Sequence, residues 1–272
     1  MEPRTDAGRA GLRAVLDDPA HALVALDYDG TLAPIVEDPG LAFVQPGVVA
    51  VLRRLTARLG TVAVLTGRPV TQVRRLAGLD GVEGLEDLQL LGQYGVERWD
   101  AATGEVVAPE PPEAVAEARA QLSDLLARLG AESVHVEDKG RALGVHVRRT
   151  ADPEGEFARL RGPLADFAAE HGLHLEPGKL VLELRAPGTD KGSALRDLVG
   201  KRRARAVVYA GDDLGDLAAY DAVDRLRQLQ VLGLLLCVGA EQPALSDQAD
   251  LVLDGPAGLV AWLAQLADLL DG

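Results

Sequence analysis

The residues from Leu23 to Leu32 read LVALDYDGTL and constrain the fold more than any other stretch of the chain. An apolar run without polar alternation ends at Asp27, and polar residues and a glycine follow before the chain turns apolar again. Short unalternated runs rich in Val and Leu are typical of a strand buried on both faces of a parallel sheet. The stretch therefore predicts an α/β protein with Asp27 at the carboxyl end of a strand, where ligands bind in open α/β sheets.

Asp27 and Asp29 lie two residues apart. Side chains at this spacing in extended chain point the same way, so both carboxylates can face one small volume. Two carboxylates that close repel each other unless a cation lies between them, and oxygen ligands suit Mg²⁺. The alternative is an ordinary Asx-type turn, in which Asp and Gly are common without any ligand.

Charge and cysteine content limit the partners that the protein can have. The chain has 272 residues and a formal net charge of −14, which argues against binding to nucleic acid or to an anionic membrane surface. Its single cysteine, Cys237, fits a reducing compartment, and the first twenty residues have no apolar leader. No apolar run approaches the length of a membrane-spanning helix. We expect a cytoplasmic, monomeric protein that acts on a small molecule.

A second buried strand is expected at residues 61–65, after a helix at 48–59, and it ends in Thr66, Gly67 and Arg68. A strand at 88–91 follows a helix that begins at Pro69. This succession of strands and helices predicts a parallel sheet with right-handed crossovers. The Thr66 hydroxyl, the backbone at Gly67 and the start of the next helix together predict an anion site. The alternative is a strand end that simply caps a helix.

The hydrophobic pattern changes after Ala108. Three prolines, at 109, 111 and 112, mark a linker. The following segment predicts helices at 113–129 and 153–171, and strictly alternating strands at 134–139, 143–148 and 179–185. Alternation with one apolar face indicates an antiparallel sheet covered by helices on one side. We therefore predict an α/β cap domain over residues 109–187, inserted into a catalytic core formed by residues 1–108 and 188–272.

The open face of the predicted antiparallel sheet carries both acids and bases. Such a face suits carbohydrate recognition, because each sugar hydroxyl is both a donor and an acceptor. Plain solvation of a surface is the alternative. The side chains on this face are those of Glu137, Lys139, His146, Arg148, Lys179, Glu183 and Arg185. We select Glu137, Lys139 and Glu183 as the candidate sugar contacts.

The last third of the chain returns to the buried-strand pattern. Thr189 is expected to cap a helix over residues 190–199, with Lys191 in its first turn. The helix dipole disfavours a cation there, so a compensating anion is expected. A strand at 206–209 then ends in GDDLGD, which brings Asp212, Asp213 and Asp216 to one strand end. The same repulsion argument predicts Mg²⁺ at this position.

Four motifs now stand in order: DxDGT at Asp27, TGR at Thr66, the lysine Lys191, and GDDxxD at Asp212. This order resembles the haloacid dehalogenase superfamily of phosphotransferases. An insertion between the second and third motifs is typical of members that act on sugar phosphates. The strings VEDKGRALGVHVR and GKLVLELRAPGTDKGSAL are similar to those of the trehalose-6-phosphate phosphatases. Two departures are Gln93-Tyr94-Gly95, where an Asn-His-Gly triplet is common, and the lack of an acidic pair after Asp213.

The resemblance implies a fold and a reaction. The fold would be the superfamily's Rossmann-like parallel core with an inserted α/β cap. The reaction would be Mg²⁺-dependent hydrolysis of trehalose 6-phosphate through an aspartyl phosphate. Asp27 would be the nucleophile and Asp29 the acid/base, while Thr66 and Lys191 hold the phosphoryl oxygens. Asp27, Asp212 and the Asp29 backbone carbonyl would bind the metal.

The resemblance also implies a substrate-binding set, and it leaves the sugar open. The expected substrate contacts are Gly67, Arg68, Glu137, Lys139, Glu183 and Asp213. An alternative is a phosphatase for another sugar phosphate, such as sucrose phosphate or a range of hexose phosphates. A third is a sugar-phosphate sensor without catalytic activity, which would be expected to have lost an acid from the first or fourth motif.

Overall fold

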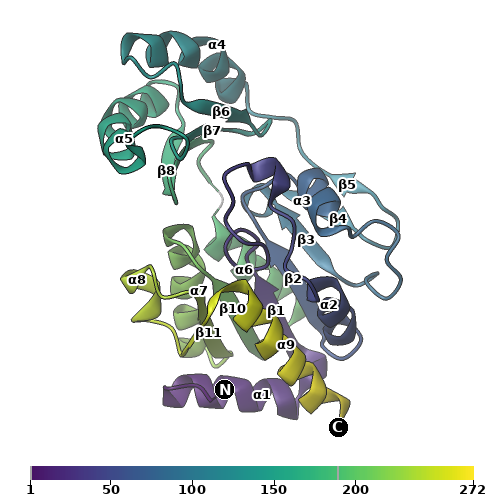
Figure 1. The fold of residues 1–272 in the computed structure, drawn as a ribbon. Coiled ribbons are helices and arrows are strands. Elements are labelled where there is room, and N and C mark those ends of the chain that lie inside the picture. Colours follow the sequence, from purple (N-terminus) through teal and green to yellow (C-terminus); the bar gives the residue numbers. More distant parts are fainter. Residues whose placement is uncertain (1, 189) are drawn as a thin grey trace. The chain divides into compact units, whose positions relative to one another are not determined.

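A twisted eight-stranded sheet forms the centre of the larger of two units in the chain (Figure 1). The computed structural model describes residues 2–188 and 190–272. The strand order is β12-β11-β10-β1-β2-β3-β4-β5, with parallel pairing from β12 to β3 and antiparallel pairing beyond it. The strands are β1 Ala22–Leu26, β2 Thr61–Leu65, β3 Gln89–Gly92, β4 Glu97–Asp100, β5 Val106–Val107, β10 Ala206–Gly211, β11 Leu232–Val238 and β12 Leu251–Leu253.

Helices cover both faces of this sheet, which is why β1, β2 and β10 are buried along their whole length. One apolar cluster joins the sheet to α2 and α9, and the other joins it to α6 and α7. The helices of this unit are α1 Asp6–Asp17, α2 Val48–Thr56, α3 Val70–Ala77, α6 Lys191–Arg202, α7 Leu217–Gln228, α8 Pro243–Ser246 and α9 Gly255–Asp271, with short 3₁₀ turns at Pro19–His21, Pro39–Leu41, Gln93–Gly95 and Leu214–Asp216.

The second compact unit spans Pro109–Gly188, and the first comprises Met1–Ala108 and Thr189–Gly272. The second unit has its own antiparallel sheet, in the order β6-β7-β9-β8, and its own apolar cluster shared with two helices. Its elements are α4 Glu113–Arg128, β6 His135–Asp138, β7 Ala142–His146, α5 Pro153–Glu170, β8 His174–Gly178 and β9 Val181–Arg185. The predicted fold class, a mainly parallel sheet with a separate antiparallel α/β unit, is confirmed.

Details of several elements differ from the sequence predictions. Helices α1, α7 and α8 and strand β8 were not predicted. β8 contains Pro177 and pairs with β9 alone, which is the edge position where a strand tolerates proline. Pro69 is the residue before helix α3 rather than its first residue. Helix α6 continues through Gly200 to Arg202, and the predicted cap at Thr189 lies outside the described residues. Among the helices described, none combines the length and the apolar character that crossing a membrane requires.

Candidate active site

The carboxyl ends of β1 and β10 bring the acids of the first and last motifs together. The two strands are parallel neighbours, and the Asp27 N–H donates to the Ala210 carbonyl at 2.9 Å. Gly30 adopts φ +77°, and a Cβ there would overlap the Asp212 carboxylate, so only glycine lets the turn pass this close. Carboxylate oxygens of Asp27, Asp212 and Asp216 lie within 4.8 Å of one another.

Lys191 lies between two of these acids. Its Nζ donates to Asp27 Oδ1 at 2.6 Å and to Asp216 Oδ1 at 2.7 Å, and its side chain is only 7% exposed. Because Lys191 is the first residue of α6, its charge opposes the helix dipole, and the two carboxylates supply the compensating anions. The capping box made by Asp190 and Ser193 fixes the start of the helix, and with it the base of the lysine side chain.

Asp216 holds this arrangement in place. Its Oδ1 also accepts from the Tyr209 hydroxyl at 2.6 Å, and its Oδ2 accepts the backbone N–H groups of Asp212 and Asp213 at 3.0 and 3.2 Å. A carboxylate offers about four lone-pair positions, so Asp216 is saturated. Asp216 therefore orients Lys191 and the turn that carries Asp212, and it has little capacity left for another ligand.

Crowding and burial shift the protonation of the whole cluster. Burial raises the pKa of Asp27 well above its ordinary value, although Lys191 opposes the shift. Burial and the neighbouring Asp27 raise the pKa of Asp212 to about 10, and burial and Asp216 raise that of Asp213 to about 6. Burial disfavours the charged form of Lys191, but Asp216 and Asp27 outweigh it and raise the lysine pKa. The carboxylates thus need more positive charge than one lysine provides, which fits a divalent cation.

The end of β2 contributes Thr66 and Gly67. The Thr66 hydroxyl accepts the N–H of Arg68 at 3.1 Å, and a Cβ on Gly67 would lie 2.8 Å from the Tyr94 hydroxyl. The predicted anion site at the following helix is not as expected, because the Val70 N–H at the start of α3 donates to the Glu97 carboxylate at 2.8 Å. A protein carboxylate from β4 thus occupies a donor that we had expected to face a phosphate.

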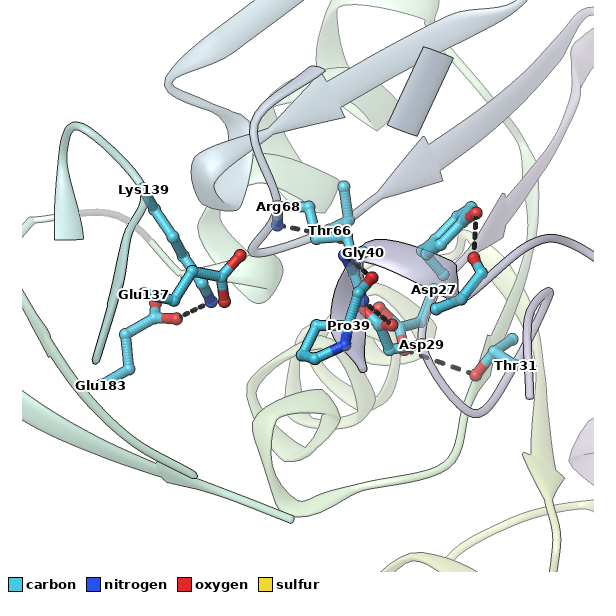
Figure 2. Close-up of polar contacts among 12 residues, drawn as sticks. Asp27, Asp29, Thr31, Pro39, Gly40, Thr66, Arg68, Glu137, Lys139 and Glu183 are labelled. Atoms are coloured by element: carbon cyan, nitrogen blue, oxygen red, sulfur yellow. Dashed lines mark hydrogen bonds and ion pairs between the residues drawn. The ribbon is translucent and has the colours of Figure 1, made fainter. Parts of the chain in front are cut away.

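Arg68 and Asp29 form a two-bonded ion pair. The Arg68 Nε donates to Asp29 Oδ2 at 2.6 Å and the Nη2 donates to Asp29 Oδ1 at 2.7 Å (Figure 2). Arg68 was expected to contact substrate, and in the structure its guanidinium faces Asp29. Asp213, another expected substrate contact, accepts the N–H of Gly215 at 2.9 Å and caps the Leu214–Asp216 turn.

The antiparallel sheet of the second unit places three glutamates in one row. Glu137 on β6 pairs with Gly144 on β7, which pairs with Glu183 on β9, which pairs with Glu176 on β8. Because Gly144 has no side chain, the His146 ring can lie over it: a Cβ at this position would be 3.1 Å from His146 Nε2.

Each glutamate of the row has a basic partner. Lys139 is paired with Glu183, as Figure 2 shows. The His146 Nε2 lies 2.9 Å from Glu137 Oε2, and the Arg185 Nη2 donates to Glu176 Oε2 at 2.8 Å.

Glu183 has an unused oxygen in this row. Its side chain is only 4% exposed, and its Oε1 has no hydrogen-bond partner among the described residues. A buried carboxylate oxygen without a donor costs free energy, so the site favours a ligand that brings a hydroxyl or an N–H group.

Sequence reasoning selected Glu137, Lys139 and Glu183. It did not single out Glu176, whose strand it missed, or Tyr209, which no motif marks.

A comparison with protein-family models matches residues 25–250 to the trehalose-phosphatase family. The chain belongs to the trehalose-phosphatase family. The match extends from β1 to the residues before β12 and therefore includes the acids of both strand ends and the second unit.

Curated relatives of this trehalose-phosphatase family member are longer than the chain. A trehalose-phosphate phosphatase of Mycobacterium avium is 34% identical over 264 residues, which cover 92% of this chain and 63% of the relative. An uncharacterized glycosyl hydrolase of Mycobacterium tuberculosis is 36% identical over 211 residues, which cover 74% of this chain and 15% of the relative. The chain thus spans less than two thirds of each of these proteins.

Solved structures of the family share the fold. The C-terminal domain of the trehalose-6-phosphate phosphatase of Candida albicans superimposes with a TM-score of 0.79 at 21% identity, covering 98% of both chains. At this level of identity the likeness concerns the fold alone.

Proposed function

We propose that the protein hydrolyses the phosphate ester of trehalose 6-phosphate, and that its first unit carries out the phosphoryl chemistry while its second unit recognises the sugar. The observation that carries the proposal is the buried cluster of Asp27, Asp212, Asp216 and Lys191 at two neighbouring strand ends. Family membership supports the choice of substrate. The catalytically silent sensor is disfavoured, because the acids and the lysine are present and lie in contact.

The reaction would proceed in two displacements at phosphorus. In the first, an Asp27 oxygen bonds to phosphorus as the bond to the sugar oxygen breaks, and Asp29 gives that oxygen its proton. In the second, water attacks phosphorus and gives its proton to Asp29, so that phosphate leaves and Asp27 is regenerated. Lys191 would neutralise the Asp27 carboxylate and then the phosphoryl oxygens, with Thr66 as a further donor.

A divalent cation fits the acidic cluster, because several carboxylates with raised pKa values converge there with one lysine between them. Asp27, Asp212 and the Asp29 backbone carbonyl would hold it, since the Asp216 oxygens already accept four hydrogen bonds. Mg²⁺ is the ion that we propose, and when bound it would neutralise charge on the phosphoryl oxygens.

The glutamate row of the second unit would bind the sugar. The unpartnered Oε1 of Glu183 can accept a hydroxyl, while Lys139 and Glu137 donate and accept around it. The His146 ring lies over Gly144, between the two glutamates, and its Nε2 pairs with Glu137, so it is available as a further polar contact for the sugar. Gly67, Arg68 and Asp213 belong to the first unit, so we propose them for the phosphate end of the ester and not for this sugar set.

Phosphate release from a panel of esters tests the proposal. We expect Mg²⁺-dependent release from trehalose 6-phosphate that is lost in Asp27→Asn and on addition of a chelator. Faster release from sucrose 6-phosphate, or equal release across hexose phosphates, would transfer the assignment to another sugar phosphatase. Binding of the ester with Mg²⁺ but without release over hours would support the sensor instead.

The sugar contact has its own test. Glu183→Gln keeps the size of the side chain but removes its charge, so we expect a KM for trehalose 6-phosphate about tenfold or more higher. Turnover of p-nitrophenyl phosphate, which has no sugar, is expected to stay close to that of the wild type. An equal loss on both esters would mean that Glu183 does not act on the sugar.

A further inference from the structure

The Asp29 carboxylate lies apart from the acidic cluster. Among the described residues, the group of acids that could share a cation comprises Asp27, Asp212 and Asp216, and Asp29 is not in it. The Asp29 side chain is 35% exposed, whereas that of Asp27 is 5% exposed. The proposed acid/base is therefore positioned by contacts other than those that position the nucleophile.

Arg68 provides those contacts. The guanidinium is 8% exposed and donates one hydrogen bond to each Asp29 oxygen, at 2.6 and 2.7 Å. Its remaining amino group, Nη1, donates to the Pro39 carbonyl at 2.9 Å (Figure 2). A planar guanidinium held at both ends has a fixed orientation, and it fixes the carboxylate that it faces.

The loop that accepts from Arg68 is anchored by a second side chain. The Tyr28 ring lies beneath the guanidinium, with the Arg68 carbon 5.6 Å from the ring centroid. The Tyr28 hydroxyl donates to the Ala42 carbonyl at 2.8 Å, three residues beyond Pro39. Arg68 is thus held by a carboxylate, a carbonyl and an aromatic face, whereas a surface ion pair has only the contact between its two charges.

A carboxylate that accepts from a guanidinium on both oxygens has no proton to donate. We propose that Arg68 is a positioning residue for the acid/base: one Asp29 oxygen keeps its bond to Arg68 while the other carries the proton toward the substrate. The proposal rests on the proposed function. As the ester bond breaks, the proton moves from that oxygen to the sugar oxygen, and the carboxylate that forms regains both bonds to Arg68. The pairing therefore fixes the direction in which Asp29 gives its proton, and it receives the carboxylate that remains after the transfer.

The choice of leaving group separates this role from a structural one. A sugar oxygen needs a proton as it leaves, whereas p-nitrophenolate does not. We would measure leaving-group release in the first turnover, with Mg²⁺, for trehalose 6-phosphate and for p-nitrophenyl phosphate. In Arg68→Gln we expect release of the sugar to slow by about tenfold or more and release of p-nitrophenolate by less than about threefold. Equal slowing of both would overturn the proposal.

A double-mutant cycle with Asp29→Asn gives a second readout. If Arg68 acts through Asp29, adding Arg68→Gln to Asp29→Asn should slow sugar release by less than about twofold further. If the double variant slows sugar release by the product of the two single-variant factors, the two residues act independently and the proposal is contradicted. Arg68→Lys keeps the charge but cannot bridge both oxygens and the loop carbonyl, so we expect a slowing between those of the wild type and Arg68→Gln. This variant carries the test if Arg68→Gln does not fold.

Arg75 offers a matched control. It lies on α3, seven residues after Arg68, and its Nη2 donates to the Gly40 carbonyl of the same loop at 3.5 Å, but among the described residues it forms no hydrogen bond or ion pair with Asp29. Arg75→Gln is expected to leave both release rates unchanged. If the wild type hydrolyses another sugar phosphate and not trehalose 6-phosphate, the proposed substrate fails, and the same cycle on that other ester still tests Arg68.

Discussion

The burial of Lys191 among carboxylates is a costly arrangement that only a complete set of partners makes tolerable. Removing a charge from water costs several kcal/mol, and opposite charges in contact offset much of that cost. Asp216 adds a second counter-charge to Lys191 and receives hydrogen bonds from Tyr209 and two backbone N–H groups. Asp216 thus stabilises the site, although we assign it neither to the reacting atoms nor to the metal.

Asp216→Asn should show this role directly. The substitution leaves Lys191 buried with one counter-charge, so we expect a loss of about 3–5 kcal/mol in the free energy of unfolding, measured in urea. The control is the exposed ion pair of Asp197 and Lys201, which lies on α6, the helix that carries Lys191. Asp197→Asn should change the free energy of unfolding by less than about 1 kcal/mol. A similar small effect for both variants would mean that the buried lysine does not depend on Asp216.

The raised pKa of Asp212 predicts how pH changes the effect of Mg²⁺. Folding raises this pKa from 3.8 to about 10, so the carboxyl contributes stability that is full below pH 3.8 and is lost as the pH rises toward 10. A bound cation stabilises the ionised Asp212 carboxylate, and it competes with the proton for the same oxygens. We therefore expect Mg²⁺ to raise the melting temperature more at pH 8 than at pH 5.5. Asp212→Asn should reduce the difference, and an equal shift at both pH values would contradict the prediction.

At this scale the sequence predicted acids better than it predicted their partners. Asp27 and Asp212 could be placed because each directly follows a buried apolar run. The hydrogen bond that the Val70 N–H donates to Glu97 joins residues 27 positions apart, and the one that Arg68 donates to Asp29 joins residues 39 positions apart. Such pairs follow from how strands are ordered in the sheet, and no local pattern marks them.

Among the elements, helix α6 depends on an unusually close approach to its neighbour. Gly192 follows Lys191, and a Cβ at this position would overlap the Ala218 carbonyl of α7. The absent side chain lets α6 pack close enough to α7 for Lys191 to reach both Asp27 and Asp216. Gly200, two turns further along α6, has open space around its Cα.

The two glycines should therefore respond to alanine in opposite ways. Gly192→Ala forces α6 away from a backbone carbonyl, and we expect it to destabilise the fold by about 1–3 kcal/mol. Gly200→Ala meets nothing and gains helix propensity, so we expect a stabilisation of about 0.5–1 kcal/mol. Urea unfolding of both variants measures the difference. If both substitutions change the free energy of unfolding in the same direction, close packing against α7 is not the reason for a glycine at position 192.

Strand types were readable from the sequence where periodicity was clear. Unalternated runs predicted β1, β2 and β10, and alternation predicted β7 and β9. Strand β8 was missed because HLEPG contains a proline and few β-branched or apolar residues. Its pairing with β9 supplies the extended conformation that its own residues do not favour.

At the scale of the whole chain, the tryptophans and tyrosines are divided unevenly between the two units. The second unit has its own cluster around β7, β9, α4 and α5, which a unit able to fold by itself requires. Both tryptophans, at 99 and 262, and all four tyrosines belong to the first unit. Tryptophan fluorescence therefore reports on the first unit alone, whereas far-ultraviolet circular dichroism reports on the helices and strands of both.

This division predicts two unfolding transitions with different dependence on metal. Only the first unit contains the acidic cluster, so Mg²⁺ should raise the temperature of the fluorescence transition. Circular dichroism should show that transition and a second one, silent in fluorescence and unmoved by Mg²⁺. Asp212→Asn should weaken the shift of the first transition without changing the second. A single transition that coincides in both signals and moves as a whole with Mg²⁺ would contradict the prediction. It would mean that the two units unfold as one cooperative structure, because a ligand of one unit then stabilises both.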